Sequence, residues 1–217
     1  MHNNITLRNR LFYGFIIGVC LLIAIISSYF IFIIIESAVI YCMIFEWYNV
    51  TGKSRFDFIA GLVFILFAAV SLLIVKLDND LSYLLAWYFI TVSTYDSFAF
   101  FGGTSFGGPK LAYSISPNKT WSGAISGLTF SIIMSLILNQ IFPYKWFLGR
   151  EEYSELILST IVLAFLAQIS DLFASFFKRK YKVKDYGNII PGHGGVLDRF
   201  DSSIFSAPYL LFLIFFN

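Results

Sequence analysis

Apolar residues occur in long runs along most of the chain, and short polar segments separate these runs. A hydrocarbon core about 30 Å thick is crossed by about 20 residues of α-helix, which is close to the length of most runs. The pattern predicts an all-α, polytopic transmembrane protein in which residues 1–217 form one membrane-embedded domain. About seven spans are expected, at residues 11–27, 29–45, 58–75, 81–101, 123–142, 156–177 and 203–216.

Three of these runs have unusual boundaries or lengths. Only Ser27 and Ser28 separate the first two runs, and one long tilted helix over residues 11–45 is the alternative. The last run, 203–216, covers about 21 Å as a helix, so it needs local thinning of the bilayer or cover from protein.

The composition also indicates lipid as the solvent of this chain. Its 217 residues are 58% hydrophobic and 13% charged, whereas soluble domains are about 45–50% apolar and about 25% charged. The net charge of +2 gives no sign of a nucleic-acid partner. Cys20 and Cys42 both lie in apolar runs, and two cysteines make no metal or redox signature.

The distribution of basic residues predicts the orientation in the membrane. With seven spans, twelve of the fifteen Lys and Arg residues fall on one side: Arg8, Arg10, Lys53, Arg55, Lys110, Lys119, Lys178, Arg179, Lys180, Lys182, Lys184 and Arg199. Short cytoplasmic loops carry an excess of Lys and Arg. We therefore expect the N-terminus in the cytoplasm and the C-terminus outside.

The polar segment 178–203 combines basic residues, carboxylates and glycines. Its candidate functional residues are Lys178, Arg179, Lys184, Asp185, His193, Gly194, Gly195, Asp198, Arg199 and Asp201. Basic side chains neutralise phosphate oxygens, glycine lets backbone N–H groups approach an anion, and carboxylates hold a divalent cation. A plain cytoplasmic loop explains the basic residues but not the carboxylates or the glycines around His193.

Two aspartates lie inside apolar runs, where an ionisable residue is costly and is a functional-site candidate. Asp171 precedes the end of its run by six residues and Asp96 by five. Both are expected roughly 8–9 Å below the same cytoplasmic face. The alternative for each is a carboxylate that pairs with a lysine in helix packing.

The segment 102–122 is rich in glycine and carries Ser116, Lys119 and Thr120. Such turns suit the phosphates of a nucleotide, although they are also ordinary loop punctuation.

Three of these segments together resemble a known family. Residues 175–179, 184–187 and 190–201 are similar to the C-terminal signature of the phosphatidate cytidylyltransferases, also called CDP-diglyceride synthetases or CDP-diacylglycerol synthases. Residues 116–123 resemble a second motif of the family, and Asp96 falls where the family carries an intramembrane aspartate. The chain departs from the family at Gly103 and Gly108, where basic residues are common.

The resemblance implies an enzyme that transfers CMP from CTP to phosphatidic acid, with CDP-diacylglycerol and pyrophosphate as products in phospholipid biosynthesis. On this basis Mg²⁺, with a second metal ion as an option, is the expected cofactor, and Asp171 and Asp198 are its expected principal ligands. The further assignments are Asp201, Asp185 and Asp96 as additional acidic groups around the metal, Lys178, Arg179, Lys184 and Arg199 on phosphates, His193, Gly194 and Gly195 on the triphosphate, and Ser116, Lys119 and Thr120 on the nucleotide.

The expected location is the bacterial inner membrane, with the active site on the cytoplasmic side, and a homodimer is compatible with this assignment. One alternative function is a cation-coupled transporter, in which Asp96 and Asp171 would line an ion path. A transporter places its site near the midplane of the bilayer, whereas these residues are expected under one face. The other alternative is an inactive or ether-lipid-specific member of the same family.

Overall fold

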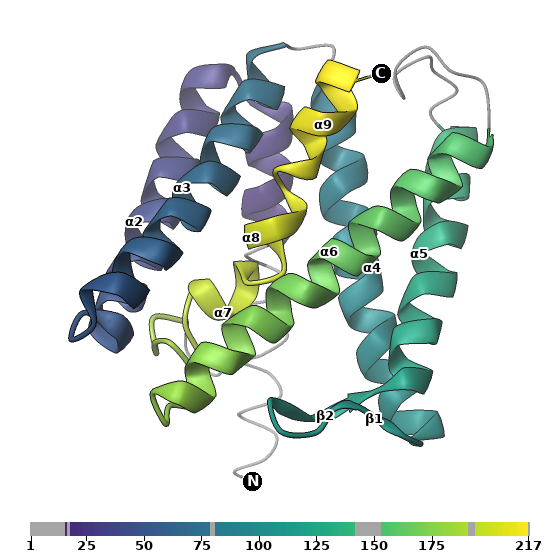
Figure 1. The fold of residues 1–217 in the computed structure, drawn as a ribbon. Helices are drawn as coiled ribbons and strands as arrows, with labels where there is room; N and C mark the ends of the chain where they lie inside the picture. Colours follow the sequence, from purple (N-terminus) through teal and green to yellow (C-terminus); the bar gives the residue numbers. More distant parts are fainter. Residues whose placement is uncertain (1–15, 17, 79–80, 142–152, 191–193, 217) are drawn as a thin grey trace, which may run out of the picture.

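The computed structural model describes residues 16, 18–78, 81–141, 153–190 and 194–216. Within them residues 18–26 are helical and end at a break formed by Ser27 and Ser28. The elements that follow are α2 (Tyr29–Thr51), α3 (Arg55–Leu77), α4 (Ser82–Phe106), β1 (Lys110–Ala112), β2 (Ser116–Thr120), α5 (Trp121–Ile141), α6 (Tyr153–Lys180), α7 (Leu197–Phe200), α8 (Ser203–Ser206) and α9 (Tyr209–Phe216) (Figure 1).

Four of the described helices, α2, α3, α5 and α6, are long and apolar enough to cross a membrane. The prediction of an α-helical membrane protein is therefore confirmed. The count of seven spans and the orientation of the N-terminus stay predictions.

Several helices extend past the apolar runs that predicted them. α4 continues to Phe106 and α6 to Lys180, so Gly102, Gly103 and Lys178 lie in helices rather than in loops. The remaining loop contains a two-stranded antiparallel hairpin of β1 and β2, which the sequence pattern did not predict. Hydropathy reports the part of a helix that suits hydrocarbon, and a helix that continues into a polar region gives no such signal.

The end of α6 is closed by two backbone hydrogen bonds. The N–H of Val183 donates to the carbonyl of Lys178 at 2.9 Å, and that of Lys182 donates to Arg179 at 3.1 Å. Lys182 takes a left-handed conformation with φ of 56°. This is the bonding pattern of a Schellman motif, and it turns the chain back toward the helix that has just ended.

The last apolar run is divided rather than continuous. A turn at Ala207 and Pro208 separates α8 from α9, and proline has no N–H to continue a helical ladder. The short helices α7 and α8 pack between α6 and the pair formed by α2 and α3 (Figure 1).

Small residues allow α4 and α5 to lie side by side. A Cβ atom added to Gly123 would lie 2.5 Å from the carbonyl oxygen of Ala99, and one added to Gly127 would lie 2.8 Å from that of Tyr95. Close backbone approach at small residues is a common way for membrane helices to associate. These glycines therefore fix the distance between the helix that carries Asp96 and its neighbour.

A buried group of hydroxyls joins α4, α5 and α6. Ser135 accepts hydrogen bonds from Trp87 Nε1 and from Thr160 Oγ1, both at 3.0 Å, and lies 3.3 Å from the hydroxyl of Thr91. Interhelical hydrogen bonds of this kind stabilise helix association in lipid.

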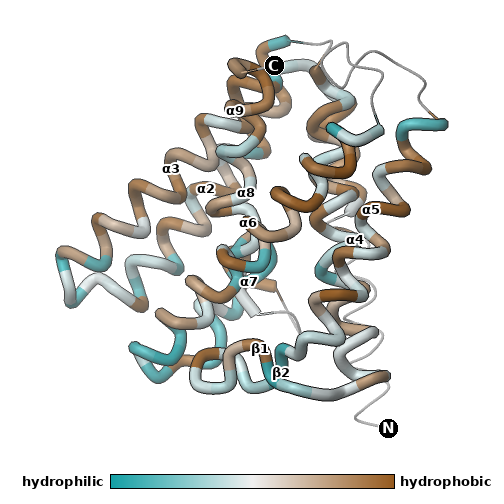
Figure 2. Tube along the Cα trace, turned by 45° about the vertical axis from the view of Figure 1, so that its right-hand side comes forward, coloured by the Kyte–Doolittle hydropathy of each residue, from teal (hydrophilic) through white to brown (hydrophobic). Residues whose placement is uncertain are grey.

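Hydrophilic residues gather at one end of the molecule, around the end of α6, α7 and the hairpin (Figure 2). Most of the described candidate functional residues belong to these segments, whereas Asp96 lies on α4.

Candidate active site

Four aspartates from separate segments form one electrostatic group. Asp96 lies on α4, Asp171 on α6 and Asp198 on α7, while Asp201 follows α7 directly. The carboxylate of Asp201 interacts with those of Asp171 and Asp96. Asp96, Asp171 and Asp201 therefore lie near one another, and Lys178 links Asp201 to Asp198.

Lys178, in the last turn of α6, balances two of these carboxylates. Its Nζ lies 3.0 Å from Oδ1 of Asp198 and 3.5 Å from Oδ2 of Asp201. The ammonium group also lies 5.4 Å from the ring centre of Tyr186. Because all three charged side chains are largely buried, the lysine supplies the positive charge that the two carboxylates need.

Asp198 has a second role, because it also holds the loop that joins α6 to α7. Its Oδ2 accepts hydrogen bonds from the backbone N–H of Tyr186 at 2.8 Å and of Gly195 at 3.0 Å. Its other oxygen, Oδ1, receives Lys178. Asp198 is therefore a fixed point at which the loop, α6 and α7 meet.

Asp201 is positioned through its backbone. The Ser170 hydroxyl of α6 donates to the carbonyl oxygen of Asp201 and accepts from the N–H of Phe205 at 3.2 Å. Burial, together with the neighbouring carboxylate of Asp171, raises the pKa of Asp201 well above its usual range. Nearby cations or phosphate-bound metal would favour its charged form.

The β-hairpin docks on α6 and adds a second lysine to the site. Lys119 of β2 forms an ion pair with Oδ2 of Asp171. On the other side of the hairpin, Nε of Arg179 donates to the carbonyl of Ile115 at 3.1 Å. The two segments that carry the family-like motifs thus meet in space.

The conformation of the loop between α6 and α7 requires a glycine at position 194. Gly194 has φ of +87°, and its carbonyl accepts from the N–H of Ile190 at 3.0 Å. A Cβ atom added there would lie 3.2 Å from Oδ2 of Asp198 and 3.3 Å from Asp185. A larger residue would be strained in this conformation and would press on the carboxylate.

Other predicted residues stand further from the centre of the group. Lys184, Asp185 and Arg199 have exposed side chains, although Arg199 interacts electrostatically with Asp96. Thr120 is buried, and its hydroxyl accepts from the N–H of Gly123 at 3.1 Å, so it caps the start of α5. Ser116 begins β2, and His193 lies outside the described residues.

Glu46 of α2 is a residue that the sequence pattern did not single out. It is 1% exposed, and its carboxylate accepts from the N–H of Val196 at 3.0 Å and of Leu197 at 2.8 Å. The predicted span ended at residue 45, which placed Glu46 in a loop. Had the span been extended, the cost of an ionisable residue in a membrane helix would have marked it.

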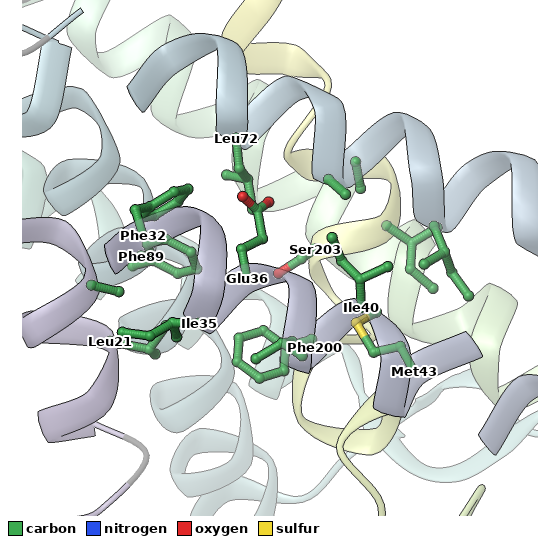
Figure 3. Close-up of a pocket in the computed structure, with 16 residues that line it drawn as sticks. Leu21, Phe32, Ile35, Glu36, Ile40, Met43, Leu72, Phe89, Phe200 and Ser203 are labelled. Atoms are coloured by element: carbon green, nitrogen blue, oxygen red, sulfur yellow. The ribbon is translucent and has the colours of Figure 1, made fainter. Parts of the chain in front are cut away.

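A second buried carboxyl group, Glu36 of α2, lies apart from the aspartate group. It points into an apolar cavity of about 70 Å³ between α2, α3 and the segment of α7 and α8, beside Leu72 and Ser203 (Figure 3). Neither of its oxygens has a hydrogen-bond partner. This cavity is formed by different side chains from those that hold Lys178.

The donor set suits a hard divalent cation, since carboxylate oxygens are the ligands that Mg²⁺ prefers. Lysine ammonium groups, at the ends of flexible side chains, contact Asp171 and Asp201, whereas Asp198 is also held by two backbone amides. Among the described residues, no three His, Cys, Asp or Glu side chains converge into a ready-made metal site. A cation would therefore exchange with lysine at Asp171 and Asp201 more readily than at Asp198.

These features define an integral membrane protein with a carboxylate and lysine site suited to phosphate groups. A model of the cytidylyltransferase family matches residues 56–217. The chain belongs to this family.

Curated relatives agree with this assignment. A phosphatidate cytidylyltransferase of Rickettsia bellii is 40% identical over 208 residues, which cover 94% of this chain and 89% of the relative. The phosphatidate cytidylyltransferase of Rickettsia prowazekii is 43% identical over 170 residues, which cover 76% of this chain and 73% of the relative. That of Bacillus subtilis is 36% identical over 187 residues, which cover 82% and 67%.

Proposed function

We propose that this protein transfers CMP from CTP to phosphatidic acid and releases CDP-diacylglycerol and pyrophosphate. The observation that carries the proposal is the convergence of Asp171, Asp198 and Asp201 with Lys178 and Lys119 at the polar end of a membrane-spanning helix bundle. A lipid phosphate and a water-soluble nucleotide can meet at such a place.

The reaction joins two anions, so charge neutralisation is its main requirement. A phosphate oxygen of phosphatidic acid attacks the α-phosphorus of CTP, and the bond from that phosphorus to the pyrophosphate oxygen breaks. The nucleophile is already an anion, so no dedicated general base is needed. The chain must therefore orient the two phosphates and offset their repulsion.

Lys178 and Lys119 are placed for this task. Each is held by aspartate in the described structure, and each has an ammonium group that can turn toward a phosphate oxygen without leaving the site. Arg199 and Lys184, which are exposed, can reach phosphates that enter from water.

We propose Mg²⁺ as the cofactor, with Asp171 and Asp201 as its first protein ligands, Asp198 beside them, and Asp96 close enough to strengthen the negative field. When bound, the metal would screen the negative charge of the phosphates. A second cation suits the number of carboxylates present.

The charge distribution supports an orientation of the protein in the membrane. The site lies at the end of α6 that carries Lys178, Arg179 and Lys180, and basic residues favour the cytoplasmic side. The proposal places the site on the cytoplasmic face of the bacterial inner membrane, where CTP is available. A homodimer is compatible with this arrangement.

Purified protein in detergent, incubated with CTP labelled at the α-phosphate, phosphatidic acid and Mg²⁺, tests the function. Label should enter the lipid fraction as CDP-diacylglycerol, and one pyrophosphate should be released for each lipid product. The matched control is Asp171→Asn. Absence of lipid product, with cation uptake into proteoliposomes that depends on Asp96 and Asp171, would instead indicate a transporter.

The same assay addresses lipid preference. Ester-linked and ether-linked phosphatidic acids compared at equal surface concentration should both be tried, because an ether-specific enzyme would turn over only the second. Failure with both substrates would contradict the proposed activity.

A further inference from the structure

Glu46 connects α2 to the loop that precedes α7. Oε1 accepts a hydrogen bond from the N–H of Val196, and Oε2 accepts one from the N–H of Leu197. These amides begin a short helix in which no side chain of the flanking residue provides a cap. A carboxylate from a distant helix therefore satisfies the N–H groups that the helix start leaves open.

The loop is shaped to fit around this carboxylate. A Cβ atom added to Gly187 or to Gly195 would collide with the carboxylate atoms of Glu46. Trp47, the next residue of α2, packs on the ring of Tyr186 with 5.7 Å between ring centres. The loop is thus in contact with α2 at both of its ends.

Three consecutive amides divide between two carboxylates. The N–H of Gly195 donates to Oδ2 of Asp198, while those of Val196 and Leu197 donate to Glu46. A shift of this stretch would move the amide that holds Asp198 together with the amides that Glu46 holds. Asp198 in turn bonds Lys178, so the position of the lysine depends on the same stretch.

We propose that Glu46 is a positioning residue, which holds the glycine loop so that Asp198 and Lys178 face the substrates. This inference rests on the proposed cytidylyltransferase function. With 1% exposure, Glu46 cannot itself touch a substrate, so it acts through the loop. It also lies outside residues 56–217, the part that matches the family model.

The charge of the carboxylate matters as well as its shape. Hydrogen bonds to an ionised acceptor are shorter and about twice as strong as those between neutral groups. In Glu46→Gln one oxygen becomes an amide NH₂, which can accept no bond from a backbone N–H. One of the two loop amides then loses its partner while the volume stays nearly the same.

The test compares Glu46→Gln with Glu36→Gln, the same change ten residues earlier on the same helix. Glu36 faces the apolar cavity and contacts no amide of the loop, so its replacement should leave kcat and both KM values near those of the unaltered protein. Glu46→Gln should lower kcat/KM for CTP by about tenfold or more.

Glu46→Asp and a stability measurement keep the test decisive. The aspartate retains the charge but is shorter. The kcat/KM of Glu46→Asp for CTP should therefore fall between that of the unaltered protein and that of Glu46→Gln. A purely structural role would lower the thermal stability and the yield of Glu46→Gln but leave the CTP KM of the folded fraction unaltered, and that result would overturn the proposal. Folded Glu46→Gln with wild-type kinetics would overturn it too.

The unaltered protein is assayed first. If it makes no CDP-diacylglycerol, the proposed function fails, and hydrogen exchange decides the inference separately. The N–H of Gly195 donates to Asp198 and not to Glu46. Faster hydrogen exchange of this N–H is expected in Glu46→Gln but not in Glu36→Gln. Equal exchange in both variants would contradict the inference.

Discussion

Lys119 of the β-hairpin forms an ion pair with Asp171 of α6, and this contact joins two segments that lie far apart in the sequence. About a fifth of the lysine side chain and somewhat more of the aspartate remain exposed. The pair is therefore more accessible than the more enclosed pair of Lys178 and Asp198.

We expect Lys119→Met to weaken substrate binding more than folding. A charge-assisted bond to phosphate contributes about 1.5–3 kcal/mol, so kcat/KM should fall by roughly tenfold to a hundredfold. The control is Lys110→Met, which removes an exposed lysine from the neighbouring strand of the same hairpin. Steady-state kinetics with both substrates decide the outcome, and equal effects of the two changes would contradict the assignment of Lys119.

Asp171→Asn and Asp198→Asn should both abolish turnover, but they should differ in stability. Asp198 accepts from two backbone amides and from Lys178, so its replacement leaves a buried partner unsatisfied at about 1–3 kcal/mol. Asp171 is more exposed, so Asp171→Asn should lower the free energy of unfolding by less than Asp198→Asn. Thermal unfolding in detergent, measured beside the activity assay, separates the two effects. Activity of both variants within a few-fold of the unaltered protein would rule out these aspartates as essential groups.

Gly103→Lys, which would restore a charge common in the family, should destabilise the protein instead of strengthening CTP binding. Gly103 is helical, and a Cβ atom there would lie 3.0 Å from Oγ1 of Thr120. That hydroxyl cannot retreat freely because it caps α5 through Gly123. Overpacking of this kind costs about 1–3 kcal/mol. Thermal unfolding of Gly103→Lys and of Gly103→Ala separates the effect of Cβ from that of the charge. A stable Gly103→Lys with a lower KM for CTP would show that the hairpin can move and that the loop approaches the nucleotide.

The charge census predicts that Lys184 faces the cytoplasm and that Glu152, which is outside the described residues, faces away from it. Each is replaced by cysteine in a protein whose Cys20 and Cys42 are serine. An impermeant maleimide applied to intact spheroplasts should label Glu152→Cys and spare Lys184→Cys until the membrane is opened. The opposite pattern would invert the topology.

Much of the site was visible in the sequence because its residues stand in unusual surroundings. Asp96 and Asp171 interrupt apolar runs, and Asp198 follows a cluster of glycines. Each departs from a local rule, and a departure from a local rule can be read without knowing the fold. The structure places Asp96 near Asp171, and their role in the site stays a prediction.

Other features could not be predicted in this way. The contact of Glu46 with Val196 and Leu197 joins residues that are 150 and 151 positions apart, and it depends on how α2 lies against α7. The use of Thr120 as a helix cap and the hairpin that carries Lys119 were likewise not marked by hydropathy. The different contacts of the aspartates were also not predictable, because they depend on which carboxylate oxygens accept from backbone amides and which pair with lysines.

The sequence by itself determined the solvent of this protein and the chemistry of its site. Apolar runs of about 20 residues are long enough to cross a bilayer as helices. Carboxylates combined with basic residues and glycines suit the binding of phosphate. The tertiary structure decided which of these groups hold the loop and which pair with lysine. Local patterns record how each segment meets lipid or water, whereas the pairing of Glu46 with loop amides and of Lys119 with Asp171 arises only when distant segments pack against one another.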